Sequence, residues 1–122
     1  VNDPGYATGD PALFTGKAMT YYGRWTYKFE EAMRQGAAGL LVIHETAAAG
    51  YPWDVPRNGA ARPQLDLELA DFESKRLALE GWIAEDATRR LLALAGQDYD
   101  RLKAEALERG GASRPLGLEA TT

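Results

Sequence analysis

The clearest periodic pattern in the chain predicts a helix in the sequence TYKFEEAMRQG. Phe29, Ala32 and Met33 recur at the spacing that puts apolar side chains on one helical face. Thr26 is expected to cap this helix, because its hydroxyl can accept a hydrogen bond from an unpaired backbone amide of the first turn. Gly36 is expected to end it, since glycine adopts the left-handed backbone conformation without steric cost.

A run of apolar residues follows the helix, and its pattern is different. Leu40 to Ile43 contain no polar break, which predicts a strand covered on both faces, as in a parallel sheet flanked by helices. Gly39 is expected to let the chain pass close to its neighbour. We therefore expect Phe29 and Leu41 to belong to the main core, with Phe29 covering the strand.

Alternation of apolar and polar residues predicts two further strands, residues 65–69 and 77–83. In the second of these, leucines and Ile83 alternate with Glu80 and Trp82. The two strands are expected to pair as a hairpin around residues 71–75.

Glycine and proline predict where regular structure stops. Residues 5–16 and 47–62 are expected to be long loops, the second packed but irregular, and residues 17–22 are expected to form a short strand between them. Two helices are predicted near the end of the chain, residues 85–95 and 98–109. Together these elements predict a mixed α/β fold, with a central β-sheet, two or three flanking helices and long loops.

Composition narrows the classes of partner. At 122 residues the chain has the length of one domain. Its formal net charge of −4 argues against a nucleic-acid partner, which would require a clustered basic face. The longest apolar run, residues 37–43, is far shorter than the roughly 18 residues that cross a bilayer. We therefore expect neither nucleic acid nor a membrane among its partners.

Few residues suit catalysis or metal binding. His44 is the only histidine and cysteine is absent, so a zinc site would have to combine His44 with carboxylates. We interpret His44 as a buried residue whose ring bonds neighbouring backbone, and Asp66 and Glu68 as the solvent-facing positions of a strand. We expect no catalytic residue, metal site or cofactor in this chain. A small hydrolase that uses Asp66, Glu68 or His44 is the less favoured alternative.

Aromatic residues gather in two segments of the sequence. The first segment contains Tyr22, Arg24 and Trp25, and the second contains Tyr51 and Trp53. Such rings, together with arginine, are enriched at protein interfaces. A strand that returns antiparallel to the preceding helix brings its end back to the level of the helix start, so both segments should lie on one edge. We interpret these five residues as a surface that contacts substrate or a partner, although packing alone would also account for the rings.

Several motifs resemble the protease-associated domain, particularly the version found in bacterial secreted zinc aminopeptidases related to glutamate carboxypeptidase. The likeness is carried by NDPG, AMTYYGRWTYKFEEA, QGAAGLLVIHET and AGYPWDV, and it covers most of the chain. The positions that match the pattern of that domain are Gly23, Arg24, Phe29, Ala32, Gly36, Ala37 and Gly39. Many members have a cysteine just before the phenylalanine, whereas this chain has Lys28 there.

The resemblance implies that residues 1–122 form one protease-associated-like domain, excised from a larger peptidase whose catalytic domain is absent. It implies a non-catalytic accessory module that shapes substrate access or protein contacts. The implied partners are the peptidase catalytic domain of the same polypeptide, which would hold the zinc, and the peptide substrate. The implied location is secreted or periplasmic. The alternative is a free-standing peptide- or sugar-binding module.

Overall fold

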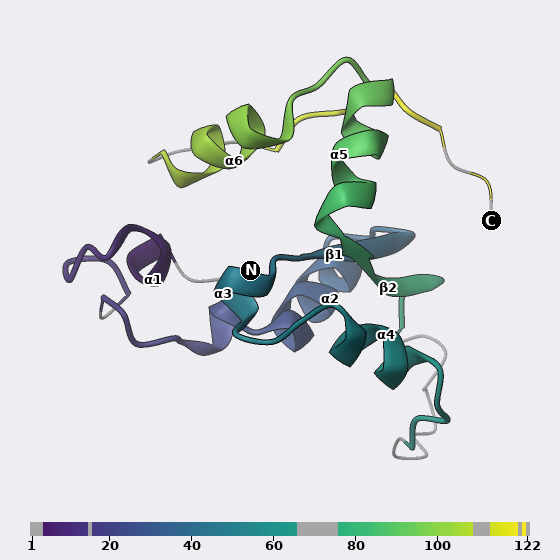
Figure 1. Cartoon of the computed structure of the whole chain (residues 1–122), viewed down its shortest axis with the longest axis horizontal. Coiled ribbons are helices and arrows are strands. Elements are labelled where there is room, and N and C mark those ends of the chain that lie inside the picture. Colours follow the sequence, from purple (N-terminus) through teal and green to yellow (C-terminus); the bar gives the residue numbers. More distant parts are fainter. Residues whose placement is uncertain (1–3, 15, 66–75, 109–112, 120, 122) are drawn as a thin grey trace. The chain divides into compact units, whose positions relative to one another are not determined.

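The computed structural model of the chain describes residues 4–14, 16–65, 76–108, 113–119 and 121. The chain divides into two compact units, Val1–Ala84 and Glu85–Thr122 (Figure 1). The first unit combines helices with a parallel sheet, and the second contains helices. The mixed helix and strand class predicted from the sequence is therefore confirmed.

The sheet of the first unit pairs β1 (Gly39–His44) with β2 (Leu79–Ala84) in parallel. Within the described residues it has these two strands. The register runs from Gly39 opposite Leu79 to His44 opposite Ala84. A Cβ atom on Gly39 would lie 2.9 Å from the Cβ atom of Leu79, closer than carbon atoms approach without repulsion. The predicted close approach at Gly39 is thus confirmed, as is the parallel pairing of the apolar strand.

The two faces of this sheet differ in burial. Val42 and His44 are each 3% exposed, and their partners across the sheet are Trp82 and Ala84. Leu41, on the opposite face, is 41% exposed. The expectation that Leu41 belongs to the main core was wrong, because the described part of the first unit covers mainly the Val42 face. Phe29 is half-buried.

The helix that precedes β1 is α2 (Trp25–Arg34), and a 3₁₀ turn, η1 (Tyr21–Gly23), leads into it. The backbone N–H of Arg24 donates to the Tyr21 carbonyl, so the helix begins directly after this turn. Thr26 therefore lies inside α2 and does not cap it, and the strand predicted for residues 17–22 was also wrong. Gly36 has a φ of +75°, which confirms its expected role at the helix end.

The loops predicted on either side of this region contain short helices, which are α1 (Pro4–Thr8), α3 (Thr46–Ala49) and α4 (Asp54–Ala60). The prediction that residues 47–62 lack regular structure was wrong. Pro56 is the third residue of α4, in the first turn, where a backbone N–H would have no partner within the helix. A proline at this position does not interrupt the helix.

The segment before β2 lies partly outside the described residues. Outside the described residues lie the hairpin predicted around residues 71–75 and the strand predicted for residues 65–69, including Asp66 and Glu68. Only Leu65 of that strand is described, and it is fully exposed. The strand predicted for residues 77–83 is confirmed as β2, which begins two residues later.

The second unit contains α5 (Glu85–Leu94) and α6 (Tyr99–Leu107). Asp98 caps α6 by accepting a hydrogen bond from the backbone N–H of Arg101 at 2.8 Å. Gly96 follows α5 with a φ of +67°. Both predicted helices are confirmed, and α6 ends at Leu107, shortly before the expected residue.

Arg89 on α5 is held by several groups of the second unit. Its guanidinium donates to Glu85 at 2.8 Å and to Asp100 at 2.7 Å. The guanidinium carbon also lies 4.5 Å from the ring centre of Tyr99, close enough for a cation–π interaction. These contacts connect α5 to the start of α6. Among the described helices of both units, none has the length and apolar character that crossing a bilayer requires.

Candidate functional site

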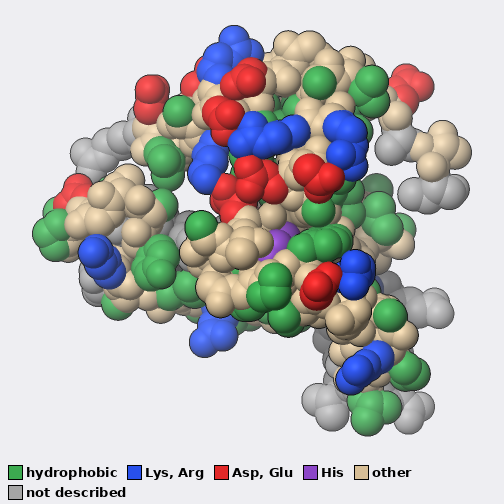
Figure 2. Space-filling model, viewed as in Figure 1, with side chains coloured by type: hydrophobic (Ala, Val, Ile, Leu, Met, Phe, Trp, Pro, Cys, Tyr) green, Lys and Arg blue, Asp and Glu red, His purple; other side chains and the backbone are tan. Residues whose placement is uncertain are grey.

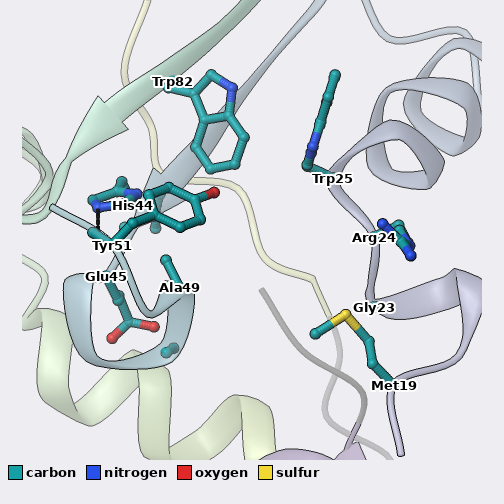
Figure 3. Close-up of a pocket in the computed structure, with 11 residues that line it drawn as sticks. Met19, Gly23, Arg24, Trp25, His44, Glu45, Ala49, Tyr51 and Trp82 are labelled. Atoms are coloured by element: carbon teal, nitrogen blue, oxygen red, sulfur yellow. Dashed lines mark hydrogen bonds between the residues drawn. The ribbon is translucent and has the colours of Figure 1, made fainter. Parts of the chain in front are cut away.

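His44 is a buried polar residue at the end of β1. Its Nε2 atom lies 3.1 Å from the carbonyl oxygen of Tyr51 (Figure 3). A carbonyl oxygen only accepts hydrogen bonds, so Nε2 carries the hydrogen and Nδ1 of the neutral ring is an acceptor. Nδ1 is buried and has no hydrogen-bond partner among the described residues. The prediction that His44 bonds neighbouring backbone is confirmed.

Aromatic rings surround the imidazole. The ring centre of His44 lies 5.3 Å from that of Tyr51, 5.7 Å from that of Trp53 and 6.2 Å from that of Trp82. Only a small part of the imidazole is visible between its neighbours in the space-filling view (Figure 2). His44 therefore joins the strand to the segment that follows it, and no carboxylate touches it among the described contacts.

A pocket of about 300 Å³ opens beside these rings, and we call it the Arg24 pocket. It is bounded by residues that precede and begin α2, residues from the end of β1 to Tyr51, and one residue of β2. Its lining residues are Met19, Gly23, Arg24, Trp25, Ile43, His44, Glu45, Ala48, Ala49, Tyr51 and Trp82. The prediction that the two aromatic segments share one edge is confirmed in this respect.

The pocket combines aromatic walls with charged groups. Trp25 and Trp82 have ring centres 6.0 Å apart, with their planes tilted by 58°. Arg24 and Glu45 approach the pocket from different sides, Arg24 beside α2 and Glu45 beyond the end of β1 (Figure 3). The guanidinium of Arg24 makes no hydrogen bond or ion pair within the described part of the chain. It is therefore available to a ligand that carries acceptor oxygens.

A second pocket, of about 320 Å³, lies against α4 and shares Trp25, Tyr51 and Trp82 with the first. We call it the α4 pocket. Its remaining lining is mostly apolar, and one polar side chain, Gln64, donates through Nε2 to the Gly59 carbonyl at 2.8 Å. Because three rings belong to both pockets, the two form neighbouring parts of one surface.

The five residues predicted to make contacts are divided by the structure. Arg24, Trp25 and Tyr51 line the Arg24 pocket. Trp53 contacts His44 and lines a third pocket, of about 390 Å³, which is also lined by Trp82 and residues of α4. Tyr22 lines none of the three described pockets, and its ring packs against Tyr27 at 5.0 Å between ring centres.

Sequence analysis missed Trp82 as a pocket residue. The alternation along its strand correctly separated Trp82 from the leucines. However, the Val42 face, to which Trp82 belongs by its pairing, is the covered one. The adjacent Gly81 gave no signal for it, because a Cβ at that position would point to the opposite face and lie 3.1 Å from Leu41.

The described residues contain no cluster of three or more histidine, aspartate or glutamate side chains arranged to hold a metal ion. Comparison with known proteins found no match among family models, curated proteins or solved structures.

Proposed function

We propose that this chain is a non-catalytic module that contacts peptides through the Arg24 pocket and the adjoining α4 pocket. The observation that carries the proposal is the meeting of Arg24, Trp25 and Tyr51 at one pocket, although Tyr51 lies far from the other two in the sequence. A pocket of this volume is within the usual range of small-molecule and side-chain sites, about 300 to 1,000 Å³.

The physical basis is preorganisation. Tryptophan and tyrosine offer large contact areas with only two rotatable side-chain bonds, so a bound partner immobilises little that was free. His44 also fixes the backbone carbonyl of Tyr51. The guanidinium of Arg24 is a charged hydrogen-bond donor. A peptide carbonyl or carboxylate that binds it takes the place of water.

The sequence resemblance supports a more specific form of this proposal. The chain would then be a protease-associated domain of a secreted or periplasmic zinc-dependent exopeptidase. The catalytic domain of the same polypeptide would be its partner and would hold the zinc. The pockets would guide the distal part of a peptide without touching the bond that reacts.

Peptide binding by the isolated chain tests the general proposal. Titration with a degenerate mixture of short peptides should quench tryptophan fluorescence in a saturable way. Trp25→Ala should weaken this response strongly, because its ring belongs to both pockets. Tyr22→Ala is the matched control and should leave the response unchanged. No response to any peptide mixture, or equal losses in the two variants, would contradict the proposal.

Kinetics test the specific form. In the parent peptidase, Arg24→Ala and Trp53→Ala should lower kcat/KM for longer peptides by about 1 to 2 kcal/mol in transition-state terms, and leave a minimal aminoacyl substrate nearly unchanged. Equal losses on both substrates would indicate misfolding. No loss on either would assign these side chains to packing.

A further inference from the structure

The surface shared by the two pockets is rich in hydrogen-bond donors. The indole N–H groups of Trp25 and Trp82 have no acceptor within the described part of the chain, and the Arg24 guanidinium adds further donors. A ligand that satisfies these groups must bring acceptors.

The α4 pocket is correspondingly poor in side-chain acceptors. Val55, Pro56 and Ala60 contribute only apolar side chains to it. The amide of Gln64 is fixed by its donation to Gly59, which leaves its oxygen and the Tyr51 hydroxyl as the acceptors in that lining. A ligand N–H placed against this apolar part would lose its hydrogen bond to water without a replacement, which is unfavourable.

We propose that the occupant of the shared Trp25, Tyr51 and Trp82 surface is a proline-rich peptide segment in the polyproline II conformation. This inference rests on the proposed function and specifies its ligand. Proline has no backbone N–H, and its carbonyls remain available to the indole and guanidinium donors. Its ring is apolar, and the polyproline II helix is already extended before binding, so little conformational entropy is lost.

The arrangement of the rings fits such a segment. The indoles of Trp25 and Trp82 are tilted by 58° relative to each other with their centres 6.0 Å apart, and both rings line both pockets. Polyproline II helices present successive ring faces every three residues, with a rise of about 3.1 Å per residue. In the proposed complex, proline rings pack against the two indoles and the intervening carbonyls accept hydrogen bonds from the indole N–H groups.

The direct test compares two end-blocked peptides of equal length, one of proline alone and one alternating alanine and glycine. Titration into the intact chain, followed by calorimetry, should show tighter binding of the oligoproline. Trp25→Phe and Trp82→Phe keep an aromatic ring but remove the N–H donor, and each should weaken oligoproline binding about three- to tenfold. Tyr22→Phe is the matched control, because it also keeps the ring and removes a donor, and Tyr22 lines none of the three described pockets; it should leave binding unchanged.

Each other outcome overturns the inference in a recognisable way. If mixed peptides bind but oligoproline binds no better than the alanine and glycine peptide, the ligand class is wrong while the proposed function stands. If no peptide binds, both fail. Binding of a neutral oligosaccharide in preference to oligoproline would assign the rings to sugar stacking. Equal losses in all three phenylalanine variants would exclude the indole donors. Should Trp82→Phe fold poorly, Trp25→Phe decides, because Trp25 is 46% exposed and its substitution disturbs packing less.

Discussion

Arg24 in the first unit and Arg89 in the second are both arginines, but their surroundings differ. Arg89 is held by Glu85, Asp100 and the ring of Tyr99, and these interactions raise its pKa above the ordinary value, chiefly through the hydrogen bond to Asp100. The guanidinium of Arg24 has no such partner within the described residues. Arg89 thus connects two helices, whereas Arg24 remains available to a ligand.

The tyrosines of the two units differ in the same way. Tyr99 is 6% exposed beneath Arg89, while Tyr22 is 52% exposed. In the second unit the tyrosine and the arginine hold helices together, whereas in the first unit Arg24 lines a pocket and Tyr22 remains half exposed outside the three described pockets. A cluster of such residues in a sequence therefore indicates function only when the structure leaves their polar groups unpaired.

The largest expected effect tests this comparison through stability. Tyr99→Ala should lower the free energy of unfolding by about 3 kcal/mol, because it removes a buried aromatic ring and leaves a cavity under Arg89. Tyr22→Ala should cost less than about 1 kcal/mol. Chemical denaturation monitored by circular dichroism measures both values. Similar losses of unfolding free energy in the two variants would contradict the distinction between a buried Tyr99 and an exposed Tyr22.

A smaller effect tests whether the pocket-bearing unit is itself rigid. Gly39→Ala places a Cβ 2.9 Å from the Cβ of Leu79, so we expect a loss of about 1 to 3 kcal/mol in the free energy of unfolding. Gly59→Ala is the control, because a Cβ at that position meets no atom within 4 Å. Thermal denaturation of the two variants gives the comparison. An unchanged melting temperature for Gly39→Ala would mean that the sheet adjusts freely there.

The two arginines provide a third test, which is specific to binding. Arg24→Ala should weaken peptide binding about tenfold, equivalent to about 1.4 kcal/mol, and leave unfolding nearly unchanged. Arg89→Ala should do the reverse, because it breaks contacts with Glu85, Asp100 and Tyr99 and touches no pocket residue among those described. Calorimetry and denaturation on both variants measure the contrast. Weakened peptide binding in Arg89→Ala would show that the two roles are not separate.

The smallest effect is a pH dependence of the second unit. Hydrogen bonds from Arg89 lower the pKa of Asp100, and an acid whose pKa is lowered on folding stabilises the folded state above its unfolded pKa. This contribution should be lost as the pH falls below about 4. The effect should be small and weaker at high salt, because the pair is exposed to solvent. Asp100→Asn should flatten this part of the stability profile, and an unchanged profile would exclude the pair as its source.

The two helices of the second unit, which were predicted correctly, are stabilised by local chemistry. Asp98 caps α6 through an amide three residues away, and Glu85 pairs with Arg89 one helical turn along. The helix α4 was not predicted because of the position of its proline. Pro56 is compatible with the first turn of a helix, but the sequence does not show where that turn begins.

The candidate site was only partly predicted, because its walls come from distant segments. The topology of α2 and β1 was enough to bring Trp25 and Tyr51 together. Trp82 reaches the pocket because β2 pairs with β1. The sequence analysis instead paired β2 with a preceding strand in a hairpin. The exposure of Leu41 and the burial of His44 also depend on which face is covered, and an uninterrupted apolar run carries no information about that.

The hydrogen bond between His44 and Tyr51 makes the pocket observable by spectroscopy. Because the chain has a single histidine, its imidazole nitrogens give a unique pair of NMR signals. The Nε2 signal reports on the hydrogen bond to the Tyr51 carbonyl. The Nδ1 signal reports on the ring's acceptor nitrogen, which is shielded from solvent. A ligand that shifts Tyr51 would change the Nε2 signal, and one that admits a donor to the imidazole would change the Nδ1 signal. The same two resonances would thus distinguish movement of the pocket wall from entry of a hydrogen-bond donor.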